Sequence, residues 1–356
     1  MSNSQWICCQ LGAREHYAIP RVLQQQNRLN RLVTDAWVES QSWFNRLPKS
    51  CLPALRERFH LELANAKVSS FNNSLINFEL IQKAKKSSGW QKTIDRNLRF
   101  QNRTIAALEK QNIKPDQQVN LFAYSYAALD IFKYAKSRGW NTILGQIDPG
   151  LLEEEYIVQE RNRYPHLRSL WQPAPPQYWQ NWQEECFLAE RIMVNSHWSK
   201  QALEKKGVAP EKIKIIPLAY NSPAKDSNFI RHYPHEFSQA RPLRVLFLGQ
   251  VILRKGIAAI LEAIELLKNE PVEFWFVGSV GITFPETIIE NKQVKIFGKV
   301  SRGTTTKYYQ QADIFLFPTH SDGFGLTQLE AQAWSLPIIT SKFCGAAVKD
   351  QINGLI

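Results

Sequence analysis

Short apolar runs alternate with amphipathic helical patterns along the last third of the chain. Five of these runs predict buried strands: Leu243–Gly249, Val272–Gly278, Val294–Phe297, Asp313–Phe317 and Pro337–Thr340. After the first run, one apolar stripe at helical spacing predicts a helix, formed by Ile257, Ile260, Leu261, Ile264 and Leu267. Two more helices are expected over Thr304–Gln311 and Leu326–Trp334. Continuous apolar strands that alternate with helices are typical of a parallel sheet covered by helices on both faces.

The first part of the chain has a similar but less regular pattern. Its candidate strands are Gln5–Cys9, Gln118–Ala123, Thr142–Ile147, Arg191–Asn195 and Lys212–Ile216. A mostly helical, basic stretch runs from about Trp43 to Gln111, and the proline-rich segment Tyr220–Pro242 is typical of a linker. We therefore predict an α/β protein with two Rossmann-like, doubly wound domains. Their ranges are 1–220 and 243–356, joined by a linker over 221–242, with a ligand cleft between the domains at the carboxyl ends of the strands.

The net charge of +12 is concentrated at one end of the 356-residue chain. Residues 1–120 hold 18 Lys and Arg against 9 Asp and Glu, whereas residues 243–356 hold 11 against 10. A protein that coats nucleic acid more often spreads its basic residues along the whole fold. The pattern therefore disfavours nucleic-acid binding and favours an anionic partner at one face of the first domain.

The sequence also indicates a cellular compartment. The five cysteines have no Cys-x-x-Cys spacing, so neither a zinc site nor a disulfide framework is expected. The N-terminus has no basic segment followed by an apolar one, as a signal peptide would, and the apolar runs are too short to cross a bilayer. We expect a cytoplasmic protein with reduced thiols, whose only membrane contact would be peripheral.

The segment Lys83–Arg103 is a candidate for such contact, because Trp90, Ile94 and Leu98 recur every four residues among Lys and Arg. One interpretation is an amphipathic helix that lies on the anionic, cytoplasmic face of a membrane. The other, which we favour, is an apolar stripe that faces the protein core and leaves a basic face in solvent.

The richest candidate site follows the predicted strand Asp313–Phe317. The loop Pro318–Leu326 contains two glycines and leads into a helix. The first amides of a helix lack internal partners and lie at the positive end of its dipole, so this loop can hold an anion. Asp322 lies in the loop before the helix and Glu330 about one turn inside the helix, where their carboxylates can bind hydroxyl groups on either side of the anion. The alternative is that Asp322 only caps the helix and Glu330 is an ordinary surface acid.

A second candidate loop, Gly249–Gly256, follows the predicted strand Leu243–Gly249 and opens at the same edge of the sheet. Arg254 can bind a phosphate through two parallel N–H groups of its guanidinium, and Lys255 through its compact ammonium charge. The alternative is a solvated basic pair. Because cations at a helix N-terminus oppose the helix dipole, the pattern favours an anionic ligand.

Together the two loops resemble the retaining glycosyltransferases of family 4 (glycosyl transferases group 1), which have the GT-B fold. Asp322–Ala331 is similar to the family's motif of two acids separated by seven residues, and Pro337–Thr340 to the strand that follows it. The resemblance covers Leu243–Ile356 and extends back to Val194–Ser196 and Ile215–Leu218. Residues 1–190 match the family only in general layout. The chain has no Asp-x-Asp metal motif, in agreement with a family that stabilises its leaving group without a metal.

The resemblance implies a role for each motif residue. Asp322 would hold the hydroxyls of the transferred sugar, and Glu330 the ribose of the nucleotide. Lys255, helped by Arg254, would neutralise the diphosphate leaving group. Further donor contacts are expected from these positions: Gln250, Val300, Gly323, Phe324, Gly325 and Leu326. The implied reaction moves a sugar from a nucleoside-diphosphate sugar to a hydroxyl of a glycan, lipid-linked or other acceptor, with retention of configuration and no cofactor or metal.

The chain departs from the family pattern in three places. Asp322 replaces the usual Glu, Gln250 stands where an Arg often follows the glycine, and the chain stops at Ile356, before the family's last strand and helices. We therefore expect an incomplete second domain. A non-catalytic nucleotide-sugar-binding or scaffold protein stays open as the alternative. An oxidoreductase is disfavoured, because no G-x-G-x-x-G motif follows any strand.

Candidate residues for the acceptor side lie at two predicted strand ends of the first domain. Gly12 and His16 follow the first strand, where the family has a glycine-rich loop, and Asp148 follows Thr142–Ile147. Gly12 matches a glycine of that loop, and the side chains of His16 and Asp148 could contact acceptor hydroxyls. The alternative for His16 and Asp148 is a turn-capping or other satisfied polar role, which we favour.

Overall fold

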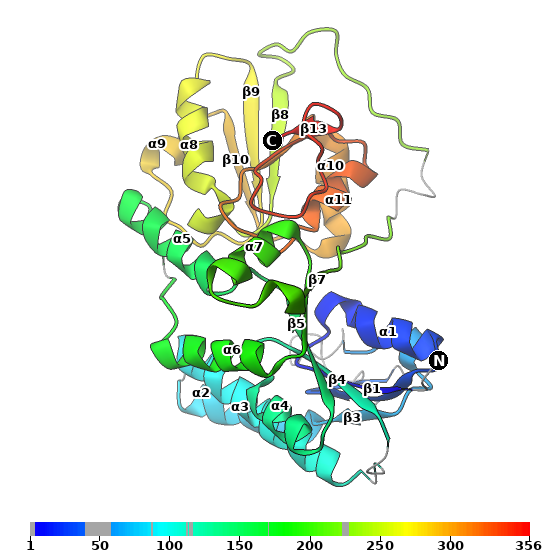
Figure 1. Cartoon of the computed structure of the whole chain (residues 1–356). Helices are drawn as coiled ribbons and strands as arrows, with labels where there is room; N and C mark the ends of the chain where they lie inside the picture. Colours follow the sequence, from blue (N-terminus) through cyan, green and yellow to red (C-terminus); the bar gives the residue numbers. More distant parts are fainter. Residues whose placement is uncertain are drawn as a thin grey trace. The chain divides into compact units, whose positions relative to one another are not determined.

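A computed structural model describes residues 4–39, 58–86, 88–111, 113, 117–169, 171–222 and 228–356. Its contacts divide the chain into two compact units (Figure 1). Unit 1 comprises Met1–Ile147, Ala174–Met193 and Glu211–Lys214, and unit 2 comprises Asp148–Pro173, Val194–Pro210 and Ile215–Ile356. The domain ranges 1–220 and 243–356 stay a prediction. Two helical segments of the range 1–220, within Asp148–Pro173 and Val194–Pro210, pack with residues 243–356 as part of unit 2.

Unit 1 is built on a seven-stranded sheet of order β3-β2-β1-β4-β5-β6-β7. Its strands are β1 Gln5–Gln10, β2 Leu29–Thr34, β3 Val68–Ser70, β4 Val119–Tyr124, β5 Asn141–Gln146, β6 Arg191–Val194 and β7 Ile213–Ile215. Its helices include α1 Ala18–Gln25, α2 Asn72–Ala84, α3 Gly89–Glu109, α4 Leu129–Ser137 and α6 Pro176–Leu188, with short 3-10 turns η1 Arg14–Tyr17 and η4 Leu61–Leu63. All five predicted strands are confirmed.

The chain order of the strands reverses beside β1 in unit 1. From β1 the chain moves outward to β2 and β3, and then returns to the other side of β1 with β4, so the switch lies between β1 and β4. Parallel pairing of β1 with both β2 and β4 places the segments after β1 and β4 at the same sheet edge. In open α/β sheets, ligands bind in the crevice at such a point.

Unit 2 is built on a six-stranded parallel sheet of order β10-β9-β8-β11-β12-β13. Its strands are β8 Leu243–Leu248, β9 Val272–Val277, β10 Val294–Gly298, β11 Ile314–Phe317, β12 Ile338–Thr340 and β13 Gly354–Leu355. Its helices are α5 Leu151–Arg163, α7 His197–Lys205, α8 Ile257–Leu266, α9 Glu286–Ile289, α10 Thr305–Gln311 and α11 Thr327–Ala333, with 3-10 turns η7 Leu253–Lys255 and η8 Arg302–Thr304. A further turn, η5 Pro210–Lys212, precedes β7.

Helices cover both faces of the unit 2 sheet, as the apolar runs predict (Figure 1). Phe247 and Phe276 point to the face covered by α8, and their strand neighbours Leu246 and Trp275 point to the face covered by α10 and α11. Successive side chains of one strand thus enter two separate cores. This is why the strands read as continuous apolar runs rather than alternating ones.

Two helices from the predicted first domain belong to unit 2. The hydroxyl of Tyr164, next to α5, donates a 2.8 Å hydrogen bond to Glu262 of α8. Trp198 of α7 is buried and packs edge-on against Phe343, 4.9 Å between ring centroids. Helices α5 and α7 are therefore structural parts of the unit that holds β8–β13.

The predicted linker has no helix or sheet strand in its described residues, 221–222 and 228–242; residues 223–227 lie outside the described part. It is nevertheless anchored by Arg231. The guanidinium donates to the carbonyls of Tyr309 at 2.7 Å, Trp334 at 2.8 Å and Ser335 at 3.0 Å, and also to that of Ala312. These carbonyls lie at the C-terminal ends of α10 and α11, where helices lack internal donors.

Replacing Arg231 with alanine is expected to lower the free energy of unfolding by about 2 kcal/mol, because several carbonyls lose one charged donor. Urea unfolding of the variant measures this loss. Lys292→Ala, which removes an exposed cation of the same unit, is the matched control and should change stability by less than about 0.5 kcal/mol. An equal effect of the two substitutions would show that Arg231 is not an anchor.

The apolar stripe of Lys83–Arg103 faces the core only in part, because Trp90 and Ile94 are half-buried. The buried face of α3 instead carries Asn97, Phe100, Gln101, Thr104 and Leu108, whereas Leu98 is 48% exposed. The favoured interpretation of this stripe therefore fails for Leu98, and polar Asn97, Gln101 and Thr104 share the buried face of the helix. None of the described helices has the length and apolar content to span a bilayer. Peripheral membrane contact stays a prediction.

Four of the five cysteines, Cys8, Cys9, Cys186 and Cys344, are buried and free. The fifth, Cys51, lies outside the described residues, as do residues 43–57 of the predicted basic helical stretch. Burial raises the pKa of the Cys8 and Cys9 thiols above the ordinary value, so these side chains act as small apolar groups of β1.

Candidate functional site

The structure brings the two predicted loops of unit 2 together. The chain order reverses between β8 and β11, so the loop after β8 and the loop after β11 lie at adjacent strand ends. The amide of His320 donates to the carbonyl of Arg254 at 2.9 Å. Gly256, at φ +75°, passes so close to Pro318 that a Cβ atom would collide with its carbonyl oxygen. Glycine is required here because no side chain fits between the loops.

Lys255 and Asp322 form a salt bridge at the centre of this site, with side chains 11% and 17% exposed. The second oxygen of Asp322 accepts the amide of Phe324 at 3.3 Å. Burial, and next the positive charge of Arg254, lower the pKa of Lys255 to about 7, whereas the neighbouring Glu153 opposes the shift. The contact with Asp322 also favours the ammonium form. An anion that enters the site would meet a cation already positioned and largely shielded from water.

Arg254 does not extend freely toward solvent. Its guanidinium donates to the carbonyl of Ser321 at 2.8 Å and to the carboxylate of Glu153 at 3.3 Å. Glu153, in the first turn of α5, also accepts the hydroxyl of Ser321 at 3.0 Å. Burial raises the pKa of Glu153 to about 7, and Arg254 opposes the shift. Arg254 is therefore held by a carboxylate in this structure, and its predicted contact with a phosphate stays a prediction.

Helix α7 holds the same loop from another direction. The indole N–H of Trp198 donates to Ser321 Oγ at 3.1 Å, and Ser199 Oγ donates to the carbonyl of Gly323 at 3.3 Å. The segment after β12 adds the amide of Gly345, which donates to the carbonyl of Phe324 at 2.8 Å. The loop that carries Asp322 is thus fixed on several sides, as a binding loop must be if its geometry is to be set before the ligand arrives.

Glu330 lies in the first turn of α11 and is half-buried. Its carboxylate accepts the hydroxyl of Tyr309 at 2.7 Å. Burial and Glu330 together raise the pKa of Tyr220, and Arg302 opposes the shift, so all three groups lie in one neighbourhood. Glu330 is therefore not the isolated surface acid of the alternative interpretation.

The other predicted donor contacts surround these residues. Gly325 has φ +79°, and a Cβ atom there would collide with Phe317. Val300, after β10, packs against the core cluster beneath α10 and α11, and Gln250 is exposed after β8. Phe324 is buried and Leu326 caps α11. The donor roles of these residues stay predictions.

The three acceptor-side candidates fall in different units. Gly12 and His16 lie in unit 1, where the Gly12 amide donates to Asp35 at 2.9 Å and His16 is exposed. Asp148 lies in unit 2, and its carboxylate accepts the amide of Gly150 at 3.0 Å at the start of α5. It also helps to raise the pKa of Glu153, so it belongs to the electrostatic surroundings of Arg254 and Lys255.

Sequence reasoning missed Glu153, Trp198 and Ser199. Glu153 is one of three consecutive glutamates, and the pattern did not show which of them faces inward. Trp198 and Ser199 lie 123 and 124 residues before their partners, so no local spacing links them.

Comparison with known proteins shows which proteins the last third of the chain resembles. A family model for glycosyl transferases group 1 matches residues 242–356. The chain is 28% identical over 184 residues to the capsular polysaccharide biosynthesis glycosyltransferase CapM of Staphylococcus aureus, covering 47% of each chain. It is 30% identical over 191 residues to a D-inositol 3-phosphate glycosyltransferase of Segniliparus rotundus, covering 47% of this chain and 41% of the relative. The chain thus spans less than half the length of these curated relatives.

Solved structures resemble the whole chain. Anabaena HepE in complex with UDP and glucose superposes with a TM-score of 0.56 at 15% identity, covering 99% of this chain and 84% of that one. The catalytic domain of Arabidopsis thaliana starch synthase IV bound to ADP and acarbose gives a TM-score of 0.59 at 12% identity, covering 98% and 85%. At such low identity these similarities establish the fold, which is GT-B.

Proposed function

We propose that this chain, which has the GT-B fold and whose residues 242–356 belong to the glycosyl transferases group 1, transfers a sugar from a nucleoside-diphosphate sugar to an acceptor hydroxyl. The observation that carries the proposal is the Lys255–Asp322 salt bridge at the switch point of unit 2, with Glu330 in the same loop-and-helix segment. The cation suits the diphosphate of a nucleotide-sugar, and the two carboxylates suit the hydroxyl groups of the sugar and the ribose on either side of it.

The proposed roles follow from charge. When the sugar departs, negative charge builds up on the nucleoside diphosphate, and the Lys255 ammonium stabilises it. Asp322 then exchanges its contact with Lys255 for the hydroxyls of the sugar, while Glu330 accepts hydrogen bonds from the ribose. We propose that these interactions suffice without a metal ion, and that the anomeric configuration is retained.

The names of two relatives suggest an acceptor class. One is a glycosyltransferase of capsular polysaccharide biosynthesis, and another is a 41.2 kDa Klebsiella pneumoniae protein from a cps region, 25% identical over 172 residues. We therefore propose that the acceptor is a glycan or a lipid-linked molecule of such a pathway. We also propose that the protein works in the cytoplasm.

A donor panel tests the proposal. UDP-, GDP-, ADP- and TDP-sugars are screened by thermal shift, since a ligand that binds only the folded protein raises its apparent stability. The best donor is then assayed for transfer or hydrolysis in the presence of EDTA, and NMR reads the product's anomeric configuration. Binding without turnover against any acceptor would instead support the non-catalytic alternative.

Replacing Glu330 with alanine is expected to weaken donor binding at least tenfold, because the ribose hydroxyls lose a charged acceptor worth about 1.5–3 kcal/mol. Calorimetric titration measures the change. Glu290→Ala, an exposed glutamate of the same unit, is the control and should leave binding unchanged. If both variants bind the donor like the wild type, the ribose assignment is wrong.

A further inference from the structure

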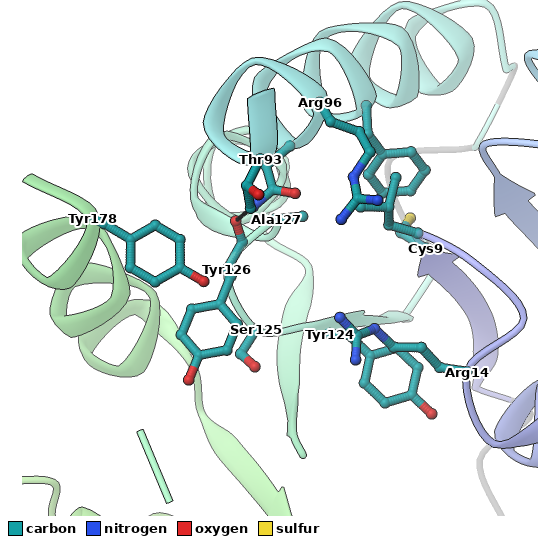
Figure 2. Close-up of a pocket in the computed structure, with 12 residues that line it drawn as sticks. Cys9, Arg14, Thr93, Arg96, Tyr124, Ser125, Tyr126, Ala127 and Tyr178 are labelled. Carbon is teal, nitrogen blue, oxygen red and sulfur yellow. Dashed lines mark hydrogen bonds between the residues drawn. The ribbon is translucent and has the colours of Figure 1, made fainter. Parts of the chain in front are cut away.

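Unit 1 contains a small pocket at its own switch point (Figure 2). Its walls come from the end of β1, from the turn after β4 and from α3. Polar lining residues include Arg14, Thr93, Arg96, Asn97 and Ser125. The cavity volume is about 60 Å³, enough for a few water molecules or one carboxylate or phosphate group, and too small for a sugar ring.

Two arginines supply the charge of this pocket. Figure 2 shows the side chains of Arg96, from α3, and Arg14, from the segment after β1, extending toward the same space from opposite sides. Within the described part of the chain neither side chain forms a salt bridge; Arg14 lies over the ring of Tyr124 at 5.6 Å. The nearby carboxylate of Glu15 is engaged by the Tyr124 hydroxyl at 3.1 Å. Two like charges that converge on one space favour an anion between them.

A buried hydroxyl points to the same conclusion independently. Ser125 is 2% exposed, and in the described structure its Oγ has no hydrogen-bond partner. Its backbone is fixed, since its amide donates to the carbonyl of Gly145 at 3.0 Å. Leaving a buried hydroxyl without a partner costs free energy, and an anion in the pocket would accept a hydrogen bond from it.

The turn that carries Ser125 is held in a strained conformation. Tyr126 has φ +74°, which is unusual for a bulky residue. The buried carboxylate of Glu185 on α6 accepts three amides of this turn, from Tyr126, Ala128 and Leu129, at 2.7–3.1 Å. Asn97 adds a hydrogen bond to the carbonyl of Tyr126 at 2.8 Å. Such strain persists where surrounding groups enforce it, and it often marks a binding site.

An aromatic wall borders the pocket. The rings of Tyr126 and Tyr178 stack with centroids 5.1 Å apart, and Trp90 packs on Tyr178 at 4.8 Å. All three side chains are half-buried, so each keeps a surface open to solvent. A ring that carries an acidic group can lie against these apolar faces while its charge enters the cavity, a combination typical of small-molecule sites.

We propose that this pocket binds the anionic substituent of an acidic acceptor sugar, either a carboxylate or a phosphate. Arg14, Arg96 and Ser125 hold the anion, and Tyr126 and Tyr178 carry the ring. The assignment to the acceptor rests on the proposed function, in which unit 2 binds the donor.

NMR titration of the full chain with three probes tests the proposal: methyl β-glucuronide, glucose 1-phosphate and neutral methyl β-glucoside. At least one charged probe should bind tenfold tighter than the neutral one, and Arg96→Ala and Ser125→Ala should each reduce that preference at least threefold. Arg103→Ala, an exposed arginine farther along α3, is the matched control and should leave it intact.

Preference for the glucuronide would assign the pocket to uronic acids, and preference for glucose 1-phosphate would assign it to sugar phosphates; both support the proposal. Equal binding of all three probes, or an effect of Arg103→Ala as large as that of Arg96→Ala, would overturn it. Donor titration is measured separately and should not change in Arg96→Ala. A protein that binds no donor yet prefers a charged probe would contradict the proposed transfer reaction but not the anion site.

Discussion

Lys255→Met is expected to reduce kcat/KM for sugar transfer roughly 10²–10³-fold, the range seen when one preorganised group that stabilises developing charge is removed. Methionine is chosen because the Lys255 ammonium lies 5.0 Å from the centroid of the Phe317 ring. An unbranched apolar side chain keeps that packing and removes only the charge. Steady-state kinetics with the best donor of the panel measures the loss.

The Lys255 prediction has a control and a pH signature. Lys268→Ala removes an exposed lysine of the same unit and should leave the rate unchanged. Because burial and Arg254 lower the pKa of Lys255 to about 7, its ammonium loses its proton as the pH rises above that value. Donor affinity of the wild type should therefore fall from pH 7 to pH 9, and Lys255→Arg, which stays charged, should flatten the profile. A rate for Lys255→Met within threefold of the wild type would refute the assignment.

Five of the six sheet strands of unit 2, all except β13, could be predicted, because strands buried on both faces appear in the sequence as apolar runs. β8, β9 and β11 are each nearly continuous apolar runs. β2 and β3 were missed for the opposite reason. Asn30 and Arg31 interrupt the apolar residues of β2, and β3 is the three-residue segment Val68–Ser70 near the edge of its sheet.

The candidate site was predictable where its residues follow strands that are neighbours in the sheet, and not where residues meet only through the packing of distant helices. Asp322, Lys255 and Glu330 follow strands whose ends adjoin in any doubly wound sheet of this order. The contact of Glu153 with Arg254 joins residues 101 positions apart, through a helix that the chain order places in the other half. Only the packing of α5 and α7 onto unit 2 reveals that they support the loop that carries Asp322.

Glu185→Ala is expected to lower the free energy of unfolding by about 4 kcal/mol, because three backbone amides of the turn after β4 lose their buried acceptor at once. Glu184→Ala removes the neighbouring carboxylate, whose salt bridge with Lys133 is exposed, and should cost less than about 1 kcal/mol. Urea unfolding followed by circular dichroism compares them. Equal losses in the two variants would contradict the role given to Glu185.

The charge of Glu185 gives a second test. One of its oxygens accepts the amides of Ala128 and Leu129, and the other accepts that of Tyr126. Glutamine would turn an amide NH2 toward one of these donors, so Glu185→Gln is also expected to be less stable than the wild type. Burial raises the pKa of Glu185 from 4.5 to about 7, although the three amides favour its charged form.

A carboxyl whose pKa is higher in the folded chain than in the unfolded chain contributes most to stability below its unfolded pKa. That contribution is lost as the pH rises through the folded value. The stability gap between the wild type and Glu185→Gln should therefore be widest near pH 4.5 and should narrow up to pH 7. A gap that stays constant over this range would show that the folded protein does not shift the pKa of Glu185. The three amides would then stabilise the carboxylate as strongly as burial destabilises it.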